Sequence, residues 1–102
     1  MDAIRLDRYV IETLMVDLVG HDRSASSFLV YLALWAKVGA RRGATARMSL
    51  ADLAEETGLS KSAVQAAARN LLRRRLVAVT RASRTATPVY AVLRPWRRGS
   101  SR

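Results

Sequence analysis

Two helix start signals in the middle of the chain lie on either side of Gly58. Ser49 precedes Asp52 with the spacing of a capping box, in which the hydroxyl and the carboxylate satisfy backbone N–H groups at the start of a helix. Gly58 can adopt the left-handed backbone that ends this helix, and Ser60 is placed to cap the next one. The two helices expected are Leu50–Thr57 and a helix that begins at Ser60 and reaches roughly Arg75.

Small and branched residues around this turn predict that the two helices pack closely. Ala54 allows the helices to approach each other, Gly58 allows the tight turn, and Val64 can fix the second helix onto the first. The leucines expected to complete the core here are Leu50, Leu53, Leu59, Leu71 and Leu72.

Two further helices are expected upstream. Apolar residues recur at spacings of three and four from Ile4 to Val19, and Gly20 is expected to stop this helix. A second helix is expected to start near Ser24, run to Val38 and end at Gly39. Because it is apolar on nearly every side, it must be either the central core helix or share a face with a partner subunit. The glycine- and arginine-rich segment 39–47 is expected to be a loop.

Downstream of the helices the period of the pattern changes to two. Residues 76–81 and 89–93 are short runs rich in β-branched side chains, and they predict a two-stranded hairpin with a longer tip. Pro88 suits the start of an edge strand, where its missing N–H costs little. The fold class expected is therefore mainly α with a small β-hairpin, about four helices plus a two-stranded wing. We expect a single domain over residues 1–98, with a helix-turn-helix at 49–75, a wing at 76–93 and a disordered tail at 99–102.

Charge is distributed unevenly along the chain, whose formal net charge is +10. Residues 1–56 hold all eight acidic side chains and seven basic ones, whereas residues 57–102 hold Lys61 and ten arginines without any Asp or Glu. GC-rich coding DNA also favours arginine, but the first half uses Asp and Glu freely. A carboxylate-free half builds a positive potential that attracts polyanions.

Several classes of function are disfavoured. The chain has no cysteine, and its one histidine, His21, is expected at the surface of a loop. The carboxylates between Asp2 and Asp22 recur every five residues, which does not keep them on one helix face, so we expect neither a metal site nor an acid–base pair. We expect no enzyme, no cofactor and no small-molecule ligand. The longest apolar stretch, Phe28–Ala36, is too short to span a bilayer. The lack of cysteine fits a reducing cytoplasm, where we expect the protein.

The stretch Leu53–Val77 resembles the winged helix-turn-helix of bacterial transcription regulators, particularly those of the GntR and MarR types. The likeness rests on Gly58–Val64, which resembles the opening of a recognition helix, and on Asn70–Val77, which resembles the passage into the wing. It extends over roughly residues 49–93. Arg75 stands where these families usually carry glycine.

The resemblance implies sequence-specific binding of double-stranded DNA and transcriptional regulation. The recognition helix would lie in the major groove, and the basic wing would lie on the backbone or in the minor groove. Three alternatives remain open at this point: a plasmid or phage replication or partition factor, a winged-helix module for protein interaction, and an RNA-binding protein. A homodimer formed through the first two helices is expected, because two recognition helices read a longer site than one.

Helical geometry divides the residues of the recognition helix between two faces. At 100° per residue, Val64, Ala67, Ala68 and Leu71 face the core. The opposite face supplies the expected base contacts, in which Gln65 suits adenine and Arg69 suits guanine. The expected base contacts are Ser62, Gln65, Ala66 and Arg69. The expected phosphate contacts are Ser49, Ser60, Lys61 and Arg73, and the wing contacts are Arg81 and Arg84.

Overall fold

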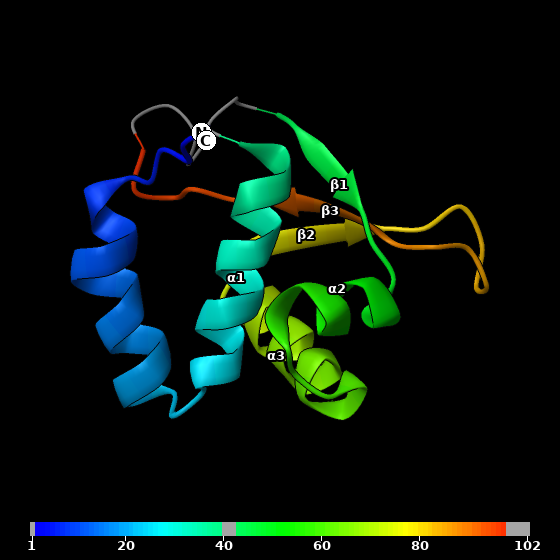
Figure 1. The fold of residues 1–102 in the computed structure, drawn as a ribbon, viewed down its shortest axis with the longest axis horizontal. Coiled ribbons are helices and arrows are strands. Elements are labelled where there is room, and N and C mark those ends of the chain that lie inside the picture. Colours follow the sequence, from blue (N-terminus) through cyan, green and yellow to red (C-terminus); the bar gives the residue numbers. More distant parts are fainter. Residues whose placement is uncertain (1, 40–42, 98–102) are drawn as a thin grey trace.

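A computed structural model describes residues 2–39 and 43–97 and consists of helices packed around a small antiparallel sheet (Figure 1). The first helix combines two π-helical segments, and we call residues 8–21 helix 1. The elements in chain order are η1 (Val10–Leu14), η2 (Val16–His21), α1 (Ala25–Val38), β1 (Thr45–Arg47), α2 (Leu50–Thr57), α3 (Lys61–Arg73), β2 (Val77–Thr80) and β3 (Val89–Val92). The mainly helical winged arrangement expected from the sequence is confirmed, while the tail predicted at 99–102 lies outside the described residues.

Helix 1 begins later and ends later than its apolar pattern predicted. Ile4 lies before the helix and is 61% exposed. Gly20 does not stop the helix, because η2 continues to His21 and the chain turns at Arg23, whose φ is 53°. The Asp22 N–H donates to the carbonyl of Asp17, five residues back, which is the spacing of a π-helix. The backbone hydrogen bonds therefore continue past Gly20.

The wider winding of helix 1 places residues four apart on one side. Val10, Leu14 and Leu18 are all buried against the rest of the molecule. Apolar residues between them, such as Ile11 and Val16, remain exposed. The helix therefore has one apolar face in the core and a second apolar face in solvent.

Helix α1 lies in the middle of the fold, between helix 1 on one side and α3 and the sheet on the other (Figure 1). Ser24 caps its start by accepting a hydrogen bond from the N–H of Ser27, and Gly39 follows its end, as predicted. Tyr31 and Trp35 are fully buried. The central core position is thus one of the two roles that its apolar sequence allowed.

The sheet has three strands rather than the expected two, in the order β1-β3-β2. Residues 39–47 were expected to form only a loop, and this was wrong, because Thr45–Arg47 pairs antiparallel with β3. Strand β3 is consequently central, with Ala46 and Val79 on either side of Tyr90. Pro88 therefore does not start an edge strand. It precedes a central one, and its carbonyl accepts a hydrogen bond from Met48.

The residues after β3 return to the start of helix 1. We call residues 94–97 the C-terminal strap. Trp96 stacks between Tyr9 and Trp35, with ring centroids 4.6 Å and 6.4 Å apart. Arg94 is buried and lies 4.1 Å over the ring of Trp35, in the geometry of a cation–π contact. The strap closes the core beside α1.

Candidate nucleic-acid interface

The turn between α2 and α3 has the local structure that its sequence predicts. Both capping-box hydrogen bonds are present, from the Asp52 N–H to the Ser49 hydroxyl (3.0 Å) and from the Ser49 N–H to the Asp52 carboxylate (2.9 Å). Gly58 has a left-handed backbone with φ 79°, and the Ser60 hydroxyl accepts a hydrogen bond from the N–H of Ala63. The bounds predicted for α2 are confirmed, whereas α3 ends at Arg73 instead of reaching Arg75.

Arg75 occupies the turn that follows α3 and has a φ of 58°. Left-handed backbone at this position explains why glycine is usual there in the resembling families, because glycine has no Cβ to clash in this conformation. The Leu76 N–H donates to the carbonyl of Leu71, which closes the end of the helix. The chain thus makes the turn into β2 without a glycine.

Helix α3 has a buried face and an exposed face, as the rotation of 100° per residue predicted. Val64, Ala67, Ala68 and Leu71 are all buried. The residues expected to contact DNA from this helix are all exposed: Ser62, Gln65, Ala66, Arg69 and Arg73. The polar face of α3 is thus available to a partner and is not part of the protein interior.

A hollow of about 220 Å³ lies between the exposed face of α3 and the sheet. Gln65 and Arg69 contribute to it from α3, and Arg81 contributes from the base of the wing. The structure therefore brings two of the predicted base-reading residues next to one of the predicted wing residues.

A second hollow, of about 360 Å³, lies between the wing and the starts of α2 and α3. Ser49, Lys61 and Arg81 line it, which unites two predicted phosphate contacts with the same wing arginine. The Ser49 hydroxyl accepts a hydrogen bond from the Asp52 N–H as the cap of α2. Thr85 and Thr87 of the wing line it as well. Sequence reasoning missed these two threonines, although hydroxyl side chains are common phosphate ligands.

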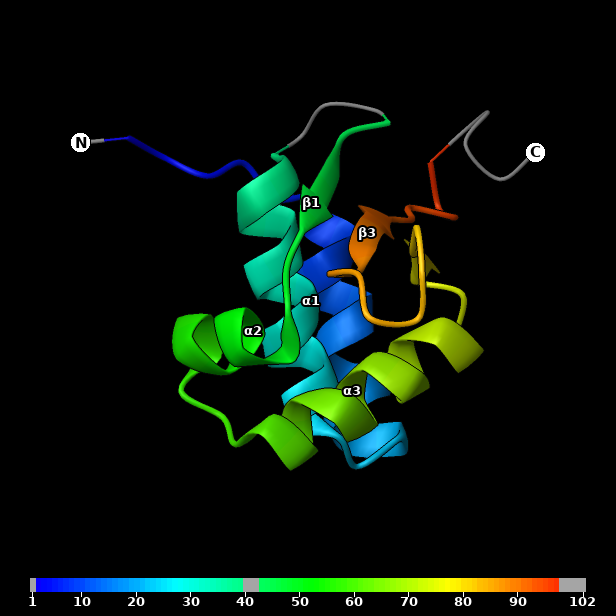
Figure 2. The ribbon, with the colours of Figure 1, turned by 90° about the vertical axis from the view of Figure 1, so that its right-hand side faces the viewer.

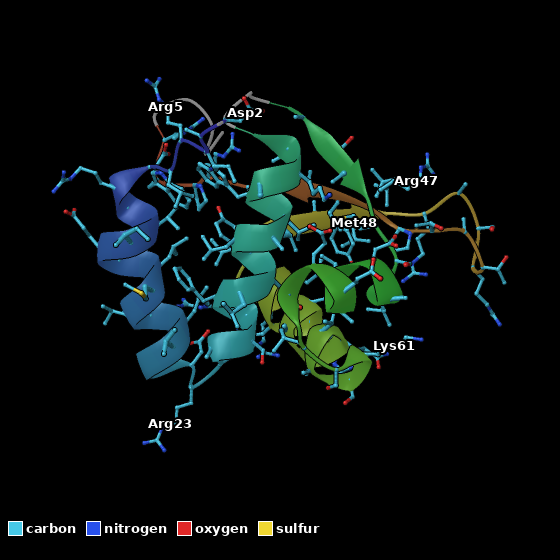
Figure 3. The ribbon with its side chains drawn as sticks, in the orientation of Figure 1. Asp2, Arg5, Arg23, Arg47, Met48 and Lys61 are labelled. Atoms are coloured by element: carbon cyan, nitrogen blue, oxygen red, sulfur yellow. The ribbon has the colours of Figure 1, made fainter. Side chains whose placement is uncertain are left out.

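These groups share one face of the molecule. Figure 2 shows α3, the start of α2 and the wing together on the face that is on the right-hand side of Figure 1. Lys61 and Arg47 lie on this side, whereas Arg5 and Arg23 lie on the side of helix 1 (Figure 3). Arg47 of β1 is a third residue that sequence reasoning left out, because its segment was interpreted as a loop.

Two of the arginines predicted to contact DNA, Arg84 and Arg73, do not line either of the two hollows. Arg84 is exposed in the wing. Arg73 is exposed too, but its guanidinium donates to the side-chain oxygen of Asn70 (2.5 Å). Arg74 binds the carboxylates of Asp22 and Asp17, and so points away from the exposed face of α3.

Acidic residues of the N-terminal region pair with the protein's own cations. Asp7 binds Arg97, and Glu12 binds Arg8 within helix 1. Helix 1 also lies on the far side of α1 from the wing (Figure 1). The acidic segment therefore does not cover the exposed face of α3.

The carboxylates at the two helix junctions are held in their charged form. The backbone N–H of Ser49 donates to Asp52, and this bond holds the pKa of Asp52 below its usual range. Burial opposes ionisation of Asp22, but hydrogen bonds from His21 and Asn70 and the nearby Arg74 guanidinium outweigh it, so the pKa of Asp22 is also lowered. The side chain of His21 is 84% exposed, as expected.

Fold and exposed basic face together define a winged helix-turn-helix domain. Residues 39–86 match the family model described as MarR family, so this segment is similar to the winged helix-turn-helix of MarR-type regulators. The match supports DNA-binding transcription regulation as the general role of this segment. No curated protein and no solved structure matches the chain. Among the described residues, no helix is long and apolar enough to cross a membrane, and no group of side chains is suited to hold a metal ion.

Proposed function

We propose that the protein binds double-stranded DNA in a sequence-specific manner, with α3 in the major groove and the wing against the backbone or the minor groove. One observation carries the proposal. Gln65 and Arg69 of the exposed face of α3 line one hollow together with Arg81. Arg81 also lines the neighbouring hollow together with Lys61. A helix fits the width of the major groove, and flanking cations hold the phosphates on either side.

Base reading would come from the exposed face of α3. Arg69 can donate two hydrogen bonds to guanine and Gln65 can pair with both edge atoms of adenine, while the methyl group of Ala66 suits the methyl group of thymine. Ser62 lies on the same face, nearer the start of the helix.

Phosphate binding would come from the hollow beside the wing. Ser49 and Ser60 cap the starts of α2 and α3, where backbone N–H groups and the helix dipole favour an anion. Lys61 and Arg81 add positive charge, and Arg84 extends it along the wing. Arg73 would reach a phosphate at the other end of α3.

A homodimer is proposed to form through helix 1 and α1. Helix 1 lies on the far side of α1 from the wing (Figure 1), and both helices expose apolar side chains. Ile11, Met15 and Val19 follow one another at spacings of four along helix 1. The exposed apolar residues of the two helices include Ile11 (44%), Met15 (37%), Val16 (63%), Val19 (41%) and Leu29 (42%). Burying such a surface against a second copy would stabilise the pair. The cytoplasm is the proposed site of action.

Selection of bound duplexes from a random library tests the proposal. The protein is expected to enrich one short motif, repeated in two half-sites if the dimer binds. Enrichment of no motif, together with equal affinity for every duplex, would contradict sequence-specific binding.

A further inference from the structure

A buried polar cluster joins the second half of α3 to the turn between helix 1 and α1. At its centre is Asn70, which is 8% exposed. Its amide nitrogen donates to the Asp22 carboxylate (3.1 Å) and to the Ser27 hydroxyl (3.0 Å). Its amide oxygen accepts a hydrogen bond from Arg73. Both the nitrogen and the oxygen of the Asn70 amide thus form hydrogen bonds.

The partners of Asn70 are themselves held in place. Ser27 is fully buried, and its hydroxyl lies 2.6 Å from that of Ser24, the cap of α1. Asp22 also accepts a hydrogen bond from Arg74 (2.9 Å). The cluster therefore links two segments that lie far apart in the sequence, residues 22–27 and 70–74.

Directed hydrogen bonds restrict α3 in a way that its apolar contacts do not. Apolar packing of Val64 and Leu71 is roughly proportional to buried area and tolerates small rotations of the helix. Hydrogen bonds weaken steeply when their angle changes. Because Asn70 directly follows Arg69, and successive side chains leave a helix 100° apart, the bonds of Asn70 fix the direction in which Arg69 leaves α3.

We propose that Asn70 is a positioning residue for base recognition, which sets the rotation of α3 so that Gln65 and Arg69 face the groove. This inference rests on the proposed function, since it assigns a role to Asn70 only if α3 reads DNA. Asn70 itself faces the interior and touches no base.

The test is Asn70→Ala. In this variant Asp22 keeps its bond from Arg74 and Ser27 keeps its contact with Ser24, and only the exposed Arg73 loses its bond to Asn70. The substitution therefore leaves no buried partner unpaired, and alanine favours a helix. Affinity for the selected duplex is expected to fall about tenfold, the effect of weakening one base contact. Affinity for random duplex is expected to change by less than about threefold, with an unchanged salt dependence, since no phosphate contact is lost.

Two controls separate positioning from stability. Val10→Ala removes buried volume in helix 1, away from α3, and is expected to lower stability while leaving the ratio of selected to random affinity at the wild-type value. The exchange of Asp22→Asn with Asn70→Asp keeps the net charge and allows the amide at position 22 to donate to the carboxylate at position 70. This exchange is expected to restore much of the selectivity that Asn70→Asp alone removes, and it continues the test if Asn70→Ala does not fold.

The outcomes are distinct. Equal losses on both duplexes, an equal loss of selectivity in Val10→Ala, or full selectivity in Asn70→Ala would overturn the positioning role alone. A wild-type protein that does not distinguish selected from random duplex would overturn the proposed function, and the positioning role with it.

Discussion

The carboxylate of Asp7 lies 2.8 Å from the guanidinium of Arg97, although the two residues are at opposite ends of the described chain. Asp7 accepts further hydrogen bonds from a second nitrogen of Arg97 and from the indole of Trp96. The bond from Arg97 outweighs burial and lowers the pKa of Asp7 to about 2. This contact ties the strap that follows β3 to the start of helix 1.

Asp7→Asn is expected to lower the free energy of unfolding by about 2 kcal/mol at pH 7, because it removes the negative charge to which Arg97 and Trp96 donate hydrogen bonds. The folded-state pKa of Asp7 is lowered, so its contribution is present above the unfolded pKa. It is lost as the pH falls from about 4 to about 2. Denaturant unfolding across this range measures it. Glu12→Gln, which breaks the exposed pair with Arg8, is the control and should cost at most about 0.5 kcal/mol. Equal effects of the two substitutions would contradict a specific role for Asp7.

Arg75→Gly is expected to stabilise the protein. Arg75 has a φ of 58°, and this backbone conformation costs a residue with a Cβ about 1–2 kcal/mol. Glycine avoids that cost, but it loses more conformational entropy on folding, which offsets part of the stabilisation. The net gain should be about 0.5–1 kcal/mol. Arg75→Val, with a branched Cβ, should destabilise instead. Thermal unfolding of both variants checks the signs, and a destabilised glycine variant would show that the Arg75 side chain outweighs its backbone cost.

Lys61→Ala and Arg81→Ala are expected to weaken binding to selected and random duplex by similar factors, because phosphates carry no sequence information. Each should make the slope of log affinity against log salt less steep by about 1. Fluorescence anisotropy at several salt concentrations measures the slope. Arg5→Ala, on the side of helix 1, is the matched control and should leave the slope unchanged. A slope that is the same in all four proteins would remove Lys61 and Arg81 from the interface.

Val16→Glu is expected to convert a dimer into a monomer, because Val16 is the most exposed of the apolar residues within helix 1 and a carboxylate there would be buried in the interface. Sedimentation equilibrium at micromolar concentration compares the variant with the wild type. Leu72→Glu is the control, since Leu72 of α3, which was wrongly expected in the core, is 42% exposed and lies outside the proposed interface. A monomeric wild type would refute the dimer.

Local signals allowed the helix-turn-helix to be predicted closely. Ser49, Asp52, Gly58 and Ser60 act on their own neighbours in the chain, so the ends of α2 and the start of α3 follow from the sequence. The exposed face of α3 follows from them, because the period of a helix fixes which residues share a side.

Elements that depend on distant partners could not be predicted in this way. β1 has only three residues and exists because the second edge of β3 is available to it. The late start of helix 1 depends on the strap, which binds Asp7 just before the helix begins. Asn70 is a polar residue on a buried face, and its partner Asp22 is 48 positions away. No pattern within a single helix indicates such a pairing.

Methylation interference tests most directly whether α3 reads the major groove. Guanine N7 lies in the major groove, and adenine N3 lies in the minor groove. We predict that methylation of N7 at a guanine of the selected site blocks binding, and that the weaker binding of Arg69→Ala is insensitive to methylation at that guanine. Interference at adenine N3 alone, with N7 methylation tolerated throughout the site, would contradict the account.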